Sequence, residues 1–345
     1  MGFETGKNRV GWRMPDESAR HECTWMAFGA DEEIWEDLLE DVQAALALVA
    51  RAISKFEPVY MLVRPEERKL AAKLCGSQVK LIDADLNDLW IRDTGAVYVL
   101  NEQGELGAVD FNFNGWGDKQ EHEDDASVAK LLADESQAVH LTTKLVGEGG
   151  GIEVDGEETA IITESCFLNE NRNPGIQKSE MEAELMRLLG LRKIIWLPGV
   201  KGQDITDGHT DFYARFASPG VVVAGLDMDR KSFDYDVTRK HLEILKSAVD
   251  ARGKKLEVVT LESPKKTRGE LRTEEFSAGY INFYVVNGAV IAPEFGDAAA
   301  DGKCKAEWMR LFPGRTIVQL NVDAIAAGGG GIHCATQQEP KVELL

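Results

Sequence analysis

Apolar residues along the chain follow two alternating periods, and the alternation predicts a repeated α/β unit. Apolar positions recurring every three to four residues indicate amphipathic helices, and short apolar runs close behind them indicate strands. The expected helices are Glu32–Lys55, Glu66–Cys75, Asp124–Glu135, Ser179–Leu189, Asp234–Arg252 and Asp297–Phe312. The expected strands that follow helices are Pro58–Val63, Val79–Ile82, Ile194–Leu197, Leu256–Thr260 and Thr316–Leu320.

A second recurring element consists of a polar residue, a strand, a tight turn and a returning strand. Its expected copies are Arg92–Leu100, Glu148–Thr163, His209–Gly225 and Asn282–Ala292, and a last strand is expected to open within Gly328–Thr336. Two of the hairpins contain Asp-Gly or Asn-Gly, pairs in which both residues can take a positive φ. These pairs predict tight turns at Asp155-Gly156 and Asn287-Gly288.

The polar residues that open these elements are regularly spaced. They are Asp93, Glu148, His209, Asn282 and Cys334, and they lie 52 to 73 residues apart. The sequence itself does not repeat, so the spacing predicts about five copies of one structural unit. Copies arranged around an axis would bring all five residues to the centre. We therefore expect one closed domain over residues 1–345.

Composition narrows the range of functions. A net charge of −20 argues against nucleic acid, because binding it requires Lys and Arg to neutralise phosphates. The same acidity would attract a cationic substrate, although solubility alone is the more common reason for it. Five scattered cysteines without a CxxC pair indicate free thiols in a reducing compartment. Without a secretory signal or an apolar run of membrane length, the chain is expected in the cytoplasm, away from membranes.

Cys334 is the strongest candidate for a reactive group. It follows four consecutive glycines, Gly328 to Gly331, which let a backbone bend sharply or approach a ligand closely. The alternative is a flexible connector before an inert buried cysteine. A thiol needs a base or a cation to become a thiolate. His333 is adjacent in sequence, but in a strand it would point to the opposite face, so a base from elsewhere is expected.

His209 and Asp211 supply such a base. Two residues apart in a strand, they would face the same side. The pair could belong to a metal site, but no HExxH motif, cysteine cluster or further histidine motif completes one. A general acid–base histidine beside a carboxylate is the better interpretation, and no metal is expected.

Asp93 and Glu148 add two carboxylates at glycine-containing bends. Taken alone, an acidic residue before a turn is usually a turn former. Together with Asp211, His209 and Cys334 they assemble three carboxylates, an imidazole and a thiol. A guanidinium group is planar, and carboxylates can hold its edges while a thiolate attacks the central carbon from the face. This chemistry requires no cofactor.

Many ordered segments resemble the agmatine deiminase family, which is related to the bacterial-type peptidylarginine deiminases within the guanidine-modifying (pentein) superfamily. The matching segments are Met14–Trp25, Ala52–Pro58, Asn87–Gly95, Phe111–Gly117, Glu148–Gly156, Thr163–Pro174, Gly208–Asp211, Tyr280–Tyr284, Ala292–Asp297 and Gly328–Pro340. The resemblance implies an α/β fold, a five-bladed α/β propeller built from ββαβ-type units with pseudo-fivefold symmetry.

The resemblance also implies a role for each matched residue. Cys334 would be the nucleophile, His209 the general acid and base, and Glu148 the residue that orients His209. Asp93 and Asp211 would bind the guanidinium, and Trp90 and Trp116 would line the substrate channel. The implied reaction is hydrolysis of agmatine to N-carbamoylputrescine and ammonia, through a covalent thiouronium on Cys334. The implied partners are a small cationic guanidino compound and a second copy of the chain in a homodimer.

The sequence departs from the family pattern at several positions. Ser18 and Phe28 stand where the family usually has tryptophan, Glu153 stands where it commonly has histidine, and Phe212-Tyr213 follow Asp211. Some of these positions are expected near the tail of the substrate, so they bear on which guanidine is used.

Other activities stay open at this point. Free arginine or a peptidyl arginine could be the guanidine, although an α-carboxylate would need a cationic partner such as Arg92 or Arg172. In an amidinotransferase, an amine would take the covalent intermediate in place of water. An inactive relative serving as a binding module would be expected to lose Cys334 or His209, and both are present. A cysteine protease would leave the three carboxylates without a role.

Overall fold

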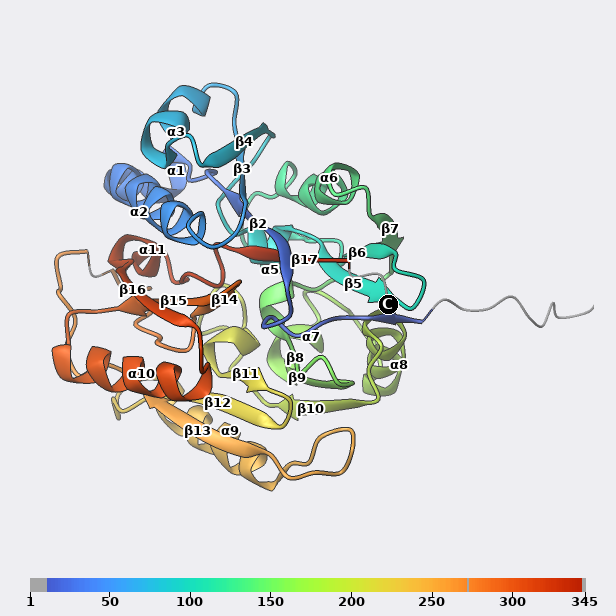
Figure 1. Cartoon of the computed structure of the whole chain (residues 1–345). Helices are drawn as coiled ribbons and strands as arrows, with labels where there is room; N and C mark the ends of the chain where they lie inside the picture. Colours follow the sequence, from blue (N-terminus) through green and yellow to red (C-terminus); the bar gives the residue numbers. More distant parts are fainter. Residues whose placement is uncertain (1–10, 272, 343–345) are drawn as a thin grey trace, which may run out of the picture.

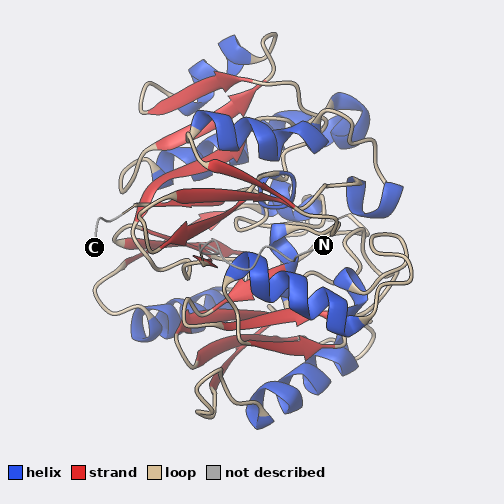
Figure 2. Cartoon of the chain, turned by 90° about the vertical axis from the view of Figure 1, so that its right-hand side faces the viewer, coloured by secondary structure: helices blue, strands red, loops and turns tan. Residues whose placement is uncertain are grey.

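The strands form five separate sheets around the centre of the molecule. The computed structural model describes residues 11–271 and 273–342. Each sheet contains an antiparallel pair of strands followed by a strand in parallel register. The sheets surround the middle of the view, and the longer helices lie outside them (Figure 1). From the side, the strands run in broadly similar directions across the molecule (Figure 2).

The strands are grouped by sheet. The first sheet contains β17 (Gln337–Pro340), β2 (His21–Ala27), β3 (Val59–Val63) and β4 (Val79–Asp83). The second contains β1 (Trp12–Arg13), β5 (Val97–Asn101), β6 (Leu106–Asp110) and β7 (Val139–Thr142). The third contains β8 (Ile152–Val154), β9 (Thr159–Thr163) and β10 (Lys193–Leu197). The fourth contains β11 (Ala214–Ser218), β12 (Val221–Leu226) and β13 (Glu257–Glu262), and the fifth β14 (Tyr284–Val286), β15 (Ala289–Glu294) and β16 (Thr316–Asn321).

One long helix in each unit leads from the antiparallel pair to the parallel strand. These helices are α2 (Leu39–Ile53), α6 (Val128–Glu135), α8 (Lys178–Leu189), α9 (Asp234–Ser247) and α10 (Ala298–Leu311). The other α-helices are α1 (Glu32–Trp35), α3 (Arg68–Cys75), α4 (Ile91–Thr94), α5 (Gly115–Asp118), α7 (Glu164–Phe167) and α11 (Asp323–Ala327). The 3₁₀ helices are η1 (Glu36–Leu38), η2 (Asp125–Ser127), η3 (Gly149–Gly151) and η4 (Thr210–Phe212). The predicted five-bladed α/β propeller of ββαβ units is thus confirmed.

The last described strand pairs with the second strand of the chain in the first sheet. β17 pairs antiparallel with β2, with Gln337 opposite Trp25, and therefore supplies the strand that the hairpin supplies in the other four units. The sequence analysis did not predict β2, so it missed this pairing. The expected turns at Asp155-Gly156 and Asn287-Gly288 do join β8 to β9 and β14 to β15.

Two expected strands are replaced by short turns. His209 and Asp211 do not share a strand, because residues 210–212 form η4, in which the Tyr213 N–H bonds to the Thr210 carbonyl at 2.8 Å. Residues 328–336 are also not a strand, since the Thr336 N–H bonds to the His333 carbonyl at 3.1 Å and β17 begins only at Gln337. The side chains in these two segments therefore do not point alternately to opposite faces, as they would in a strand.

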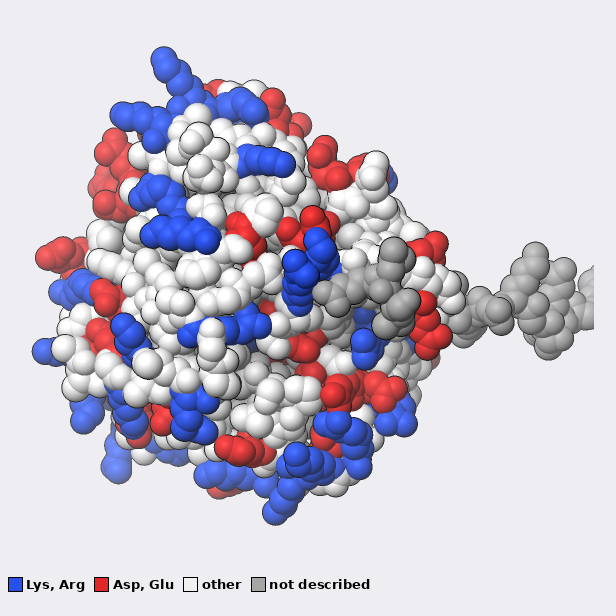
Figure 3. All heavy atoms as spheres, viewed as in Figure 1, with Lys and Arg blue, Asp and Glu red and all other residues white. Residues whose placement is uncertain are grey.

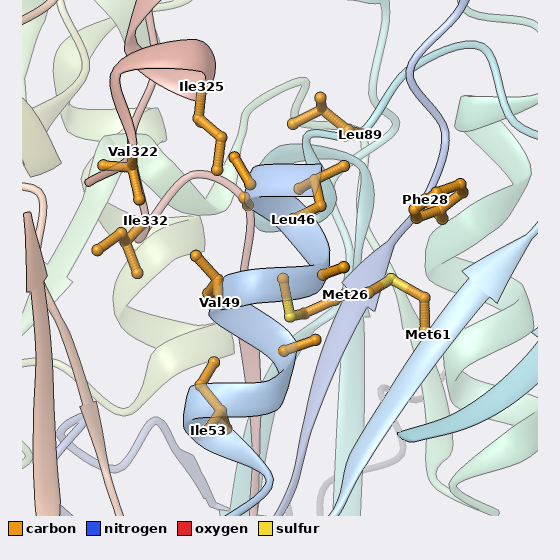
Figure 4. Packing of buried hydrophobic residues seen from close by; sticks show 14 of the residues in the cluster. Met26, Phe28, Leu46, Val49, Ile53, Met61, Leu89, Val322, Ile325 and Ile332 are labelled. Atoms are coloured by element: carbon orange, nitrogen blue, oxygen red, sulfur yellow. The ribbon is translucent and has the colours of Figure 1, made fainter. Parts of the chain in front are cut away.

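Helix α2 forms part of the hydrophobic core next to the segment of residues 328–336. Its residue Leu46 is fully buried, as are Met26 of β2 and Ile332, and the cluster that contains them also includes Cys334. Figure 4 shows α2 lying between the strands that carry Met26 and Met61 on one side and the segment that carries Ile332 on the other. The expected helix over residues 32–55 is interrupted before α2, where Glu36 has a φ of 45°.

The surface carries both signs of charge despite the net charge of −20. On the face shown in Figure 3, basic and acidic side chains are interspersed around uncharged areas. Within residues 11–271 and 273–342, no helix has the length and apolar character to cross a membrane.

Replacing Leu46 by Ala should destabilise the fold by about 2–5 kcal/mol, because it leaves a cavity in the cluster next to Cys334. The matched control is Leu70→Ala in α3, where the leucine is 39% exposed and the loss should stay within about 0.5 kcal/mol. Urea unfolding of the three proteins measures both changes. Equal losses of stability in the two variants would contradict this role of Leu46 in the core.

Candidate active site

The five polar residues that open the repeated elements converge in two linked groups. Cys334 Sγ lies 3.2 Å from Asn282 Nδ2 and 3.4 Å from Asp211 Oδ2. His209 Nε2 lies 3.2 Å from Glu148 Oε2, and His209 Nδ1 lies 3.6 Å from Asp93 Oδ2. The turn η4 links the groups, since it carries Asp211 and directly follows His209. The sequence prediction that these residues meet is therefore confirmed.

Three of the four glycines before Cys334, Gly328, Gly330 and Gly331, are packed tightly against neighbouring side chains. A Cβ at Gly330 would lie 2.1 Å from the ring of Trp90, and one at Gly331 would lie 2.4 Å from Asn282 Oδ1. Gly329 has a φ of +83°, which side chains rarely tolerate. The run is thus not a flexible connector, because a larger residue would meet either a close neighbour or an unfavourable φ.

Asn282 fixes the backbone that carries the thiol. Its Oδ1 accepts hydrogen bonds from the N–H groups of His333 at 2.9 Å and Cys334 at 3.3 Å. Its Nδ2 donates to the sulfur. The sequence analysis placed Asn282 at an equivalent point of its unit but assigned it no role. Its equivalent position in the repeated unit was the sequence feature that could have identified Asn282 as a site residue.

The thiol of Cys334 is held neutral in the absence of a cation. Burial raises its pKa well above the usual range, and the negative charges of Asp211 and Asp93 raise it further, while the Asn282 hydrogen bond acts against them. A cation between the two carboxylates would cancel their repulsion of the thiolate. The site is therefore suited to form its nucleophile when a cationic substrate arrives.

His209 and Glu148 form a buried ion pair. Burial opposes the charge of His209, but Asp93, Cys166 and Glu148 together raise its pKa well above the usual range. Burial likewise opposes the charge of Glu148, yet the hydrogen bond from His209 and the charge of Arg172 lower its pKa to about 2. His209 therefore starts as an imidazolium that can act first as an acid.

Two residues behind Glu148 were missed by the sequence analysis. Arg172 Nε donates to Glu148 Oε1 at 2.9 Å, and Arg172 Nη1 donates to Asp207 Oδ2 at 2.7 Å. The Cys166 thiol donates to Glu148 Oε2 at 3.2 Å, the oxygen that His209 also contacts. Both residues lie 18 or more positions from Glu148, so only the fold reveals these contacts.

Glu148, Cys166 and His209 have the only ligand atoms in the described chain that cluster closely enough to suggest a metal site. The three atoms lie within 4.8 Å of one another, and their types suit zinc. However, Glu148 already carries the Arg172 guanidinium. Burial and the charge of Glu148 also raise the pKa of Cys166 to about 11, so that its thiol is protonated and donates to Glu148 Oε2. The geometry is explained by hydrogen bonding, and the absence of a metal stays a prediction.

Asp93 is held by two donors. Trp116 Nε1 donates to its Oδ2 at 3.0 Å, and the Gly150 N–H donates to its Oδ1 at 3.1 Å. Burial raises the pKa of Asp93 to about 6, although the charge of His209 acts in the opposite direction. Trp116 therefore directly contacts the carboxylate that is predicted to bind the substrate.

Trp90 lies against the glycine-rich segment. Its Nε1 donates to Asp88 Oδ2 at 3.0 Å, and Asp88 Oδ1 accepts from Trp35 Nε1 at 2.8 Å. The two indole rings are 5.9 Å apart. Asp88 thus holds two tryptophans on one carboxylate, and the role of Trp90 and Trp116 in lining a substrate channel stays a prediction.

Asp211 contacts a residue that the sequence analysis set aside. His333 Nδ1 lies 2.7 Å from Asp211 Oδ2, because residue 333 belongs to a turn and not to a strand. Burial opposes the charge of Asp211, but the hydrogen bond and charge of His333 lower its pKa. Asp211 Oδ1 is buried and has no hydrogen-bond partner among the described residues. One oxygen of this carboxylate thus remains for a substrate.

The positions that depart from the family pattern have structural partners. Glu153 accepts from Arg215 Nε at 2.8 Å and from the Phe216 N–H at 2.7 Å. Phe28 is fully buried in the cluster around α2, and the Ser18 hydroxyl bonds to Asp16. Their expected proximity to the substrate tail stays a prediction.

Replacing Arg172 by Met should destabilise the protein by about 3–5 kcal/mol, because it removes one of the two cations that compensate the fully buried Glu148 carboxylate. The control is Arg192→Met, which removes a surface pair with Glu158 whose side chains are 60% and 40% exposed and should cost no more than about 1 kcal/mol. Chemical unfolding gives both values. Similar losses in the two variants would contradict the importance of the buried pair.

Comparison with known proteins agrees with this geometry. The family model described as Porphyromonas-type peptidyl-arginine deiminase matches residues 13–340. A Streptomyces coelicolor protein, whose name assigns it provisionally to the agmatine deiminases, is 43% identical over 338 residues, with 96% of this chain and 99% of that protein covered. An agmatine deiminase of Pseudomonas aeruginosa is 36% identical over 353 residues and covers 96% of each chain.

Solved structures give the same result. A structure described as the agmatine deiminase of Enterococcus faecalis catalysing its reaction superposes with a TM-score of 0.91 at 32% identity. The match covers 96% of this chain and 97% of that one. Sequence and fold agree along nearly the whole length. The chain therefore belongs to the Porphyromonas-type peptidyl-arginine deiminase family.

Proposed function

We propose that this protein hydrolyses agmatine to N-carbamoylputrescine and ammonia, with Cys334 as the nucleophile. The observation that carries the proposal is the surrounding of the thiol. Asp211 lies 3.4 Å from the sulfur and keeps one oxygen without a partner among the described residues, while Asp93 stands beside His209. Two carboxylates, a thiol and an imidazolium are the groups that guanidinium hydrolysis requires. The relatives named agmatine deiminase support the choice of substrate.

Binding of the substrate prepares the nucleophile. Asp93 and Asp211 accept N–H groups of the guanidinium, whose positive charge offsets the two negative charges that raise the pKa of Cys334. The thiol then loses its proton to water more readily. The thiolate attacks the central carbon, and a C–S bond forms while the C=N electron pair moves onto nitrogen.

The remaining steps use His209 in both of its protonation states. The imidazolium gives its proton to one amino group, the C–N bond breaks, and ammonia leaves a thiouronium on Cys334. Neutral His209 takes a proton from water, and the hydroxide adds to the same carbon. The C–S bond then breaks and the hydroxyl proton of the adduct passes to the departing sulfur, which releases the neutral ureido product and restores the Cys334 thiol. Glu148 holds the imidazole in place through both steps, at 3.2 Å.

The buried arginines near the site favour agmatine over free arginine. A substrate α-carboxylate would need a cation, but Arg172 is fully buried and bonded to Glu148 and Asp207. Arg92 donates to the His333 carbonyl and to Gln338 and lies 3.5 Å from Glu17. Both cations are already paired with carboxylates of the protein, although Arg92 Nη2 has no hydrogen-bond partner among the described residues. Agmatine has no carboxylate and so does not require one.

The partner proposed here is thus a small cationic guanidino compound, bound without a cofactor. Assembly as a homodimer, a cytoplasmic location and the absence of contact with nucleic acid or membranes remain proposals from the sequence.

Replacing Cys334 by Ala should reduce agmatine turnover by at least about 1,000-fold, because the covalent route is lost. The matched control is Cys304→Ala in α10, a buried thiol in a different cluster, which should retain near-normal turnover. Release of ammonia and of the ureido product is measured for both. Undiminished turnover in Cys334→Ala would reject the proposed mechanism.

The same assay distinguishes the competing activities. Wild-type protein is given agmatine, free arginine and a peptide with a C-terminal arginine at equal concentrations. Agmatine should give the highest kcat/KM, and a preference for either arginine substrate would overturn the choice of agmatine. Addition of a primary amine should not divert product, whereas a new guanidino product would indicate amidinotransfer.

The activity should fall on the acid side of about pH 6, because Asp93 becomes protonated there and loses its hold on the cation. The pKa of this carboxyl is raised, so the active ionised form is present above pH 6 and is lost below it. We expect log kcat/KM to fall with a slope of about one per pH unit. A profile that stays flat down to pH 4.5, with the fold checked by circular dichroism, would contradict this role.

A further inference from the structure

The imidazole of His333 lies between two carboxylates. Its Nδ1 is 2.7 Å from Asp211 Oδ2, and its Nε2 is 2.8 Å from Glu17 Oε2. The side chain is 2% exposed, so water does not compete for these contacts. The adjacent Cys334 N–H and the His333 N–H both bond to Asn282. The histidine is therefore fixed at its backbone and at both ring nitrogens.

In both contacts the ring nitrogen must be the hydrogen-bond donor. An ionised carboxylate only accepts hydrogen bonds, and a neutral imidazole has a single N–H. Burial opposes the charge of Glu17, but Arg215 and His333 lower its pKa, as His333 does for Asp211. With both carboxylates ionised, a ring N–H is the donor in each of the two contacts. His209, in contrast, is the histidine whose proton takes part in the proposed reaction.

Glu17 anchors the side of the ring that faces away from Asp211. Its Oε1 accepts from the Val285 N–H at 2.7 Å and from Arg215 Nη2 at 2.8 Å, and its Oε2 lies 3.5 Å from Arg92 Nη2. Arg215 is in turn held by Glu153. These partners come from the strands β14 and β11 and from α4, so three units of the ring hold Glu17.

The contact from His333 fixes the carboxylate of Asp211. Its Oδ2 is occupied by His333 and lies near the thiol, while its Oδ1 is buried without a partner among the described residues. Fixing one oxygen determines where the other lies. We propose that His333 is a positioning residue that holds Asp211, and through it the guanidinium, in line for attack by Cys334. This inference rests on the proposed guanidine hydrolysis.

A purely structural role is the alternative. In that case His333 would serve only to neutralise Glu17 and complete the turn, and its bond to Asp211 would be incidental. The two roles use different nitrogens of the ring, Nδ1 for Asp211 and Nε2 for Glu17. Substitutions that place a nitrogen at only one of these two positions can therefore distinguish the two roles.

The decisive pair of variants is His333→Asn and His333→Gln. Both remove the positive charge, but the amide nitrogen of Asn occupies roughly the place of Nδ1, and that of Gln the place of Nε2. We expect His333→Asn to keep kcat/KM within about 10-fold of wild type and His333→Gln to lose about 100-fold, since small misplacements near a reacting centre have effects of this size. The difference should appear in kcat as well as in KM. Equal losses, or a more active Gln variant, would overturn the proposal.

Binding gives a readout that does not depend on turnover. The same two substitutions are made in a Cys334→Ala background, and agmatine binding is measured by calorimetry, with urea unfolding as the check on the fold. The Asn variant should bind at least about 10-fold more tightly than the Gln variant. If wild type turns over no guanidine, the proposed function fails, while the binding comparison still decides the role of His333. Equal binding by the two variants, or no binding by the Cys334→Ala parent, would reject that role.

Discussion

The need to bury several charges at one centre governs this structure. Glu17, Asp93, Glu148 and Asp211 are all nearly inaccessible to water, and a buried carboxylate is costly unless a cation or several donors compensate it. No single blade supplies enough partners. Glu148 takes His209 and Arg172, and Glu17 takes His333 and Arg215. Two of these cations, His209 and Arg215, come from the fourth unit, so the site forms only when several units pack together.

The completion of the ring also places the nucleophile. Cys334 precedes β17 by two residues, and β17 is the strand that pairs with β2 near the other end of the chain. The pairing of strands about 310 residues apart thus brings the thiol beside Asp211 and Asn282. A contact so distant in sequence has a high entropic cost of loop closure, which the buried cluster around α2 helps to offset. The strand pairing that stabilises the first sheet therefore also sets the geometry of the site.

The spacing of polar residues predicted the repeated unit and the meeting of Asp93, Glu148, His209 and Cys334, because both follow from local patterns. The contacts of His333 could not be predicted in the same way. Periodicity suggested a strand, but glycines packed against Trp90 and Asn282 impose a turn, which directs the ring toward Asp211. Its second partner, Glu17, lies 316 residues away. Such contacts depend on how the blades close, and no local signal in one sequence carries that information.

The two carboxylates proposed to hold the substrate are not equivalent, and the difference lies in their histidines. His333 binds Asp211 at 2.7 Å and keeps its pKa low, whereas His209 lies 3.6 Å from Asp93, whose pKa is raised to about 6 mainly by burial. A histidine that must release and recover a proton cannot be bound too tightly to its neighbour, because each added contact with an anion favours the imidazolium. A histidine that only orients a carboxylate has no such limit. The short contact on one side and the longer one on the other therefore match two different tasks within a single reaction.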